Sequence, residues 1–81
     1  MSTRFAATDA ATFEGTRGGV VSVFDPHIGL GYVRCDDGAE YLMHCISIAD
    51  GSRNVAVGQR VEFSCTTRFG RAEATRITKL S

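Results

Sequence analysis

The residues with the clearest binding chemistry lie between Gly29 and His44. Tyr32 has a flat ring that can stack, His44 has a ring that can stack or hydrogen-bond, and Arg34 has a cation that can pair with an anion. Each also has a structural interpretation, as an exposed strand residue, a strand cap or a solubilising charge. The sequence shows no nucleophile with a plausible base, no carboxylate pair and no metal-ligand spacing. We therefore expect neither an enzyme nor a cofactor or metal site.

Two predicted strands, residues 29–35 and 40–45, must position these side chains. The intervening Asp36-Asp37-Gly38 is a strong turn signal. Because side chains alternate along a strand, one face of the first strand carries Leu30, Tyr32 and Arg34. In the second strand Leu42 and His44 share a face.

Three further strands complete the predicted fold. Residues 20–24 form a β-branched run that ends at Asp25-Pro26, and residues 60–65 and 72–79 follow later in the chain. Residues 46–57 form a long surface loop, which includes Arg53 and has room for one short helical turn. Val61, Phe63 and Cys65 should point inward. Five short strands in about 63 residues predict a small closed barrel.

Composition indicates one small globular domain. The 81 residues are 43% hydrophobic and 22% charged, and nine basic residues balance nine acidic ones. Zero net charge removes the overall basicity that usually marks a phosphate-binding protein, although a local basic patch stays possible. Three cysteines without a C-x-x-C pair suggest reduced thiols and a cytoplasmic location. No segment resembles a signal peptide or a membrane span.

The first 16 residues are expected to form a flexible tail, followed by the domain at 17–81. This segment is rich in Ala, Thr and Ser. The alternative is that Phe5 or Phe13 packs on the domain or on a partner.

Several motifs in order resemble the cold-shock domain. They are Gly19-Val20-Val21-Ser22-Val23-Phe24, Gly29-Leu30-Gly31-Tyr32-Val33, Asp37-Gly38, Tyr41-Leu42-Met43-His44 and Gly58-Gln59-Arg60-Val61-Glu62-Phe63. The similarity covers residues 17 to 79. It implies an all-β, five-stranded antiparallel barrel of the OB type. It also implies binding of single-stranded RNA or DNA on the face of strands one to three, where exposed aromatic rings stack on bases.

This chain lacks most of the aromatic rings of that family's binding face. Val23 takes the place of the exposed Trp of strand one, and Leu30 and Leu42 take the places of two phenylalanines. Tyr32 and His44 are retained, and Phe24 is at a family aromatic position. Losing three stacking partners at about 1.4 kcal/mol each would weaken binding about a thousandfold.

Two functions follow from the resemblance and its departures. The first is weak binding of single-stranded RNA or DNA with little sequence specificity, in the regulation of transcription or translation. It would use Phe24, Leu30, Tyr32, Leu42 and His44, with Arg34 and Arg53 near phosphates. The second is a protein-protein interaction module in a regulator. That module would use an apolar patch formed by Val23, Leu30, Tyr32 and Leu42, unless the tail covers the patch through Phe5 or Phe13.

Overall fold

Five strands and one short helix follow the β-branched and alternating segments of the sequence. The computed structural model describes residues 12–68 and 70–80. The strands are β1 (Arg17–Asp25), β2 (Leu30–Cys35), β3 (Glu40–His44), β4 (Arg60–Arg68) and β5 (Arg71–Lys79), and a 3-10 helix, η1, covers Cys45–Ser47. β1 and β4 are each three or more residues longer than the sequence predicts. The extra residues of β1 lie at its start and include Gly19, which pairs with Cys35 on β2 and with Val61 on β4.

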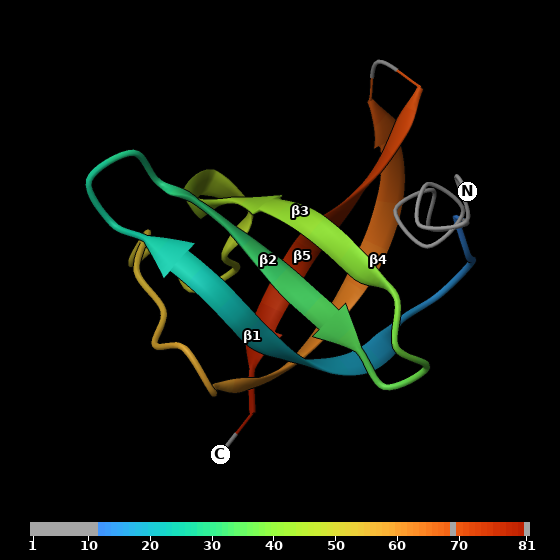
Figure 1. Ribbon diagram of the computed structural model, residues 1–81, viewed down its shortest axis with the longest axis horizontal. Helices are drawn as coiled ribbons and strands as arrows, with labels where there is room; N and C mark the ends of the chain where they lie inside the picture. Colours follow the sequence, from blue (N-terminus) through green and yellow to red (C-terminus); the bar gives the residue numbers. More distant parts are fainter. Residues whose placement is uncertain (1–11, 69, 81) are drawn as a thin grey trace, which may run out of the picture.

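The strands close into a barrel in the order β1-β2-β3-β5-β4. In Figure 1, β1, β2 and β3 form the front layer, β4 and β5 cross behind it, and the β4–β5 hairpin extends beyond the barrel. The expected OB-type fold is confirmed. One pairing departs from the antiparallel description: β3 and β5 run parallel where Leu42 lies opposite Glu73. An isolated parallel bridge from Ile48 to Ile77 continues this joint.

The turns around β2 are fixed by aspartate side chains. The Asp25 carboxylate accepts a hydrogen bond from the His27 N–H at 2.9 Å, and Pro26 between them cannot extend the strand. After β2, the Asp37 carboxylate accepts from the Ala39 N–H at 3.0 Å. Gly38 adopts a φ of 99°, which a side chain would strain. These turns set the register of β1, β2 and β3.

A bulge at Ser22 decides which way the end of β1 faces. Val21 lies opposite Val33, whereas Val23 lies opposite Tyr32, so β1 contains one extra residue between the two pairs. Simple alternation would place Val23 on the buried face with Val21. The bulge instead turns Val23 outward, where it is 51% exposed. A Cβ atom on Gly31 would collide with the Val23 carbonyl oxygen, so only glycine fits there.

The core is a cluster of side chains that alternate along all five strands. Its largest fully buried members are Tyr41, Phe63, Met43, Ile77, Val21, Val33 and Val61. Val61 and Phe63 point inward as predicted, and Cys65 is half-buried and packs against the cluster.

Phe13, which precedes β1, also packs on this core. Its ring meets Tyr41 at 5.7 Å and Phe63 at 5.6 Å between centroids, both edge-to-face. The Arg17 guanidinium lies 4.3 Å from the centre of the Phe13 ring. Phe13 therefore packs on the domain, which the sequence analysis gave as the alternative to a flexible tail. Residues 1–11, with Phe5, lie outside the described residues.

Candidate functional site

Cross-strand register brings most of the predicted site residues together on one surface. Tyr32 lies opposite Val23 on one side and Leu42 on the other, Leu30 lies opposite His44, and Arg34 lies opposite Glu40. Residues directly opposite in a sheet share a face. We call this surface the β1–β3 face. By the same register it includes Val20, opposite Arg34, and the exposed Asp25, opposite Leu30, together with Val23, Leu30, Tyr32, Arg34, Glu40, Leu42 and His44.

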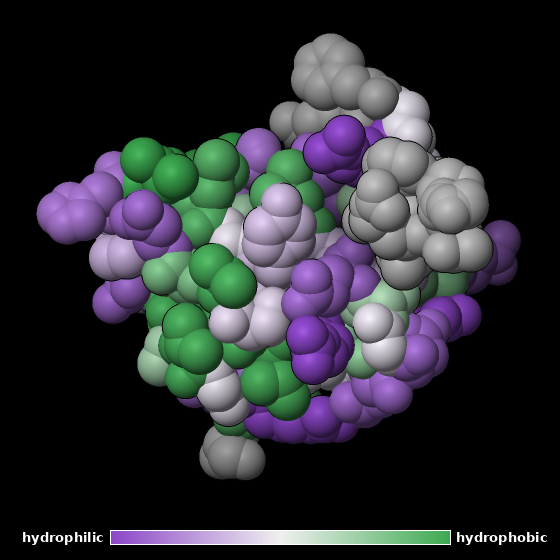
Figure 2. Space-filling model, viewed as in Figure 1, coloured by the Kyte–Doolittle hydropathy of each residue, from purple (hydrophilic) through white to green (hydrophobic). Residues whose placement is uncertain are grey.

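The middle of the β1–β3 face is apolar. Val23 is 51% exposed and Tyr32 41%, whereas Leu30, Leu42 and His44 are half-buried. Figure 2 shows hydrophobic side chains gathered over this sheet and toward the β1–β2 turn, with hydrophilic ones bordering them on the right.

Two more exposed apolar residues lie near this surface, Ile28 in the β1–β2 turn and Ile46 on η1. Ile28 and Ile46 are 65% and 68% exposed, and a hydrogen bond of 2.8 Å from the Cys45 N–H to the Gly29 carbonyl joins the segments that carry them. The sequence analysis did not identify either isoleucine, and neither belongs to a strand pattern.

A polar group borders the apolar centre at the end of β2. Arg34 Nη2 lies 3.3 Å from Glu40 Oε2, and the Ser22 hydroxyl donates to the same carboxylate oxygen at 3.2 Å. Glu40 is a face residue that sequence reasoning missed. The signal was available, because Glu40 alternates with Leu42 and His44 on the same side of β3. Glu40 thus offsets part of the Arg34 charge, in an ion pair whose two side chains are exposed to solvent.

Two predicted site residues do not join the β1–β3 face in this way. Phe24 lies opposite Gly31, hence on the inner side of the sheet, and it packs against the core. Arg53 is exposed on the loop between η1 and β4, with a φ of 57°. No described contact joins Arg53 to the sheet.

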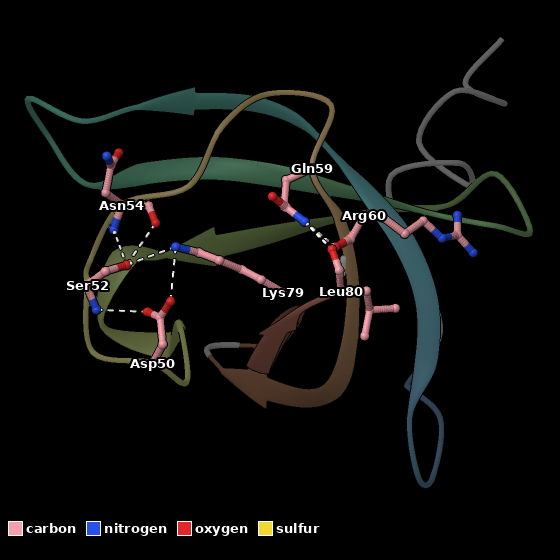
Figure 3. A network of polar contacts seen from close by, with 7 residues as sticks. All are labelled: Asp50, Ser52, Asn54, Gln59, Arg60, Lys79 and Leu80. Carbon is pink, nitrogen blue, oxygen red and sulfur yellow. Dashed lines mark hydrogen bonds and ion pairs between the residues drawn. The ribbon is translucent and has the colours of Figure 1, made fainter.

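The loop that carries Arg53 is attached to β5 instead. Lys79 Nζ lies 3.0 Å from Asp50 Oδ2 and 3.1 Å from Ser52 Oγ, and the Asp50 carboxylate also accepts from the Ser52 N–H at 2.8 Å (Figure 3). The hydrogen bond from the Ser52 backbone is the largest of the interactions that lower the pKa of Asp50 to about 2. These contacts attach the loop to β5 next to Arg53, whereas the Arg53 side chain itself is exposed.

Two more cations in the described part of the chain are paired with carboxylates. Arg17 pairs with Asp37 at 3.1 Å, and Arg60 pairs with Asp36 through two contacts of 2.6 and 2.7 Å. The hydrogen bonds from Arg60 lower the pKa of Asp36. Among the described side chains, Arg53, Arg71 and Arg76 take part in no ion pair, and none of them belongs to the β1–β3 face. The face therefore offers rings, aliphatic groups, one exposed ion pair and the Asp25 carboxylate.

Comparison with known proteins agrees with this architecture. Residues 17–80 match the model of the "Cold-shock" DNA-binding domain. A solved structure of cold-shock domains from Drosophila Unr is similar to this chain, with a TM-score of 0.70 and 23% sequence identity. The match covers 99% of this chain and 30% of that one, so the chain spans less than a third of its length. No curated protein matches the chain.

No helix among the described residues is long and apolar enough to cross a membrane. The family model covers most of the chain, including all five strands and both turns that set the β1–β3 face. The chain belongs to the cold-shock domain family.

Proposed function

We propose that this domain binds single-stranded RNA or DNA weakly and with little sequence preference, as a binding module in the regulation of transcription or translation. The observation that supports this most is the position of Tyr32, an exposed ring at the centre of a three-strand face. Aromatic stacking on a base contributes about 1 to 3 kcal/mol and tolerates any base. His44 lies on β3, diagonally opposite Tyr32, and adds a second ring.

Weak binding follows from the rest of the same face. Val23, Leu30 and Leu42 can pack on a base but lack the flat ring that stacks most favourably. Arg34 must share its charge between Glu40 and any phosphate, since the two side chains are 3.3 Å apart. Phosphate contacts would therefore depend on Arg53 and on partial release of Arg34.

The test is a titration of the full chain with labelled oligo-dT and with single-stranded RNA at low and physiological salt. We expect a dissociation constant in the micromolar range that weakens as salt rises. Tyr32→Ala should weaken binding at least about fivefold. Thr78→Ala, an exposed change on β5, is the matched control and should leave the affinity unchanged. Absence of binding at about 100 µM in low salt would rule out this function.

A second function is favoured by the exposure of apolar side chains on the β1–β3 face. Val23, Leu30, Tyr32 and Leu42 would form the contact surface of a protein interaction module. Contiguous exposed apolar surface often marks a protein interface. Leu30→Asp should abolish capture of such a partner, and a partner that binds this variant normally would count against the face.

We also propose a cytoplasmic location. Its support is that Cys35, Cys45 and Cys65 are all free thiols, as expected in a reducing compartment. Alkylation of freshly isolated protein under denaturing conditions should modify all three cysteines, whereas a disulfide would contradict the proposal.

A further inference from the structure

We propose that two copies of this chain associate through their β1–β3 faces, as a weak symmetric dimer. This does not depend on nucleic-acid binding. The starting observation is that the β2 and β3 part of the face combines an apolar centre with one cation, Arg34, and one anion, Glu40, because a surface that binds its own copy must be complementary to itself.

The register of β2 and β3 makes this face complementary to itself. Each outward-facing residue of β2 has its partner directly opposite on β3: Leu30 with His44, Tyr32 with Leu42, and Arg34 with Glu40. A two-fold axis that runs along the strands, midway between β2 and β3, exchanges the two positions of every pair. Tyr32 of one copy then lies over Leu42 of the other, and Arg34 over Glu40.

Charge favours the same occupant. The formal net charge is zero, so two copies do not repel each other as a whole. Within the face, Arg34 and Glu40 already attract each other at 3.3 Å. In the dimer each would gain a second opposite charge from the other copy, and no like charges would be forced together along this axis.

The size of the face sets the strength of association. The axis places β1 of each copy beyond the β3 edge of the other, so only β2 and β3 overlap. Two strands about 4.8 Å apart, with residues about 3.3 Å apart along each, give an overlap of about 10 by 17 Å. This is smaller than the roughly 800 Å² per partner of a standard interface. We therefore expect a dissociation constant on the order of 100 µM.

Sedimentation equilibrium without nucleic acid tests the proposal. The average mass should rise from that of the 8.7 kDa monomer toward twice that value between about 10 µM and 1 mM protein. A chain that stays monomeric at about 1 mM would overturn the proposal. Because no nucleic acid is present, this outcome is independent of the oligonucleotide titration.

Charge reversal tests the arrangement of the two copies. Arg34→Glu makes both residues of the Arg34–Glu40 pair acidic and Glu40→Arg makes both basic, so each variant alone should be monomeric. An equimolar mixture of the two variants should associate at least as tightly as the unchanged chain, because an acidic face then meets a basic face. Recovery in the mixture also shows that both variants are folded. Association of either variant alone at unchanged strength, or failure of the mixture to associate, would contradict this interface.

The matched control reverses charges away from the face. Arg71→Glu on β5 and Glu62→Arg on β4 are exposed and change the net charge by the same amounts. At about 0.15 M salt, where charges more than about 8 Å apart are screened, each should dimerise within about twofold of the unchanged chain. Loss of association in these variants would attribute the effect to net charge and overturn the assignment to the β1–β3 face.

Discussion

At the scale of single residues, we expect Arg34 and Glu40, as well as Tyr32, to affect the proposed nucleic-acid binding. In the proposed function Tyr32 would supply stacking, which does not depend on charge. Glu40 decides whether Arg34 is available to a phosphate, because its carboxylate lies within salt-bridge distance of the guanidinium. An exposed ion pair contributes only about 0 to 1 kcal/mol, so it can be broken at modest cost.

Removing the Glu40 charge should therefore strengthen nucleic-acid binding. Glu40→Gln keeps the shape of the side chain but frees Arg34 for phosphate. We expect up to about fivefold tighter binding of oligo-dT at low salt. The control, Glu62→Gln, removes an equal charge from β4. If both variants gain affinity equally, the gain comes from net charge and not from Arg34.

Asp50 gives a residue-scale prediction about pH. Its pKa of about 2 lies below the ordinary value of 3.8, first because of the Ser52 backbone hydrogen bond and then because of Ser52 Oγ and Lys79. A lowered pKa means that the ionised form is stabilised in the folded state. This contribution is fully present above pH 3.8 and is lost as the pH falls through about 2.

The measurement is an NMR titration of the Asp50 side-chain carboxyl from pH 6 to pH 1.5. In Lys79→Met the pKa should move upward but stay below the ordinary value, since the Ser52 N–H still donates at 2.8 Å. An unchanged pKa in Lys79→Met would show that the contact from Lys79 does not act on Asp50.

At the scale of elements, the segment before β1 contributes to the barrel core. The family model begins at residue 17, yet the Phe13 ring lies within 6 Å of both Tyr41 and Phe63, centroid to centroid at 5.7 and 5.6 Å. Arg17 covers the outer side of the Phe13 ring and also pairs with Asp37. The segment therefore connects the core to the β2–β3 turn.

Truncating Phe13 should destabilise the whole domain. Phe13→Ala removes a half-buried ring from an aromatic cluster, and we expect a loss of about 2 to 3 kcal/mol in the free energy of unfolding, measured with urea. Phe13→Leu, which keeps much of the apolar volume, should lose less. Thr12→Ala, an exposed neighbour, should change the stability by less than about 0.5 kcal/mol. A Phe13→Ala loss as small as that of Thr12→Ala would contradict a role in the core.

The elements also show what the sequence could predict. The strands, the turn at Asp37-Gly38 and the shared face of Leu30, Tyr32 and Arg34 follow from alternation and turn chemistry, and all are present. The inward position of Phe24 could not be predicted, because the bulge at Ser22 shifts the alternation by one residue. The packing of Phe13 could not be predicted either, because its partner rings lie on β3 and β4 and the local sequence before β1 gives no information about them.

At the scale of the whole molecule, charge is distributed as local pairs rather than as a basic surface. Zero formal net charge accompanies ion pairs at Arg17, Arg34, Arg60 and Lys79 in the described part of the chain. The closed barrel places these pairs at turns and strand ends around its circumference. A single-stranded nucleic acid crossing the β1–β3 face would therefore meet few free cations.

Binding should consequently depend only weakly on salt. Each phosphate neutralised on a single strand contributes about 0.7 to the slope of log affinity against log salt, so Arg34 and Arg53 together predict a slope of about 1.4. Arg53→Gln should lower the slope by about 0.7, whereas Arg71→Gln, on β5 away from the face, should leave it unchanged. The measurement is the oligo-dT affinity at four salt concentrations from about 20 to 200 mM. A slope above about 3 would mean that more cations than these two contact phosphate. An Arg71→Gln effect equal to that of Arg53→Gln would contradict a phosphate path that includes Arg53 but not β5.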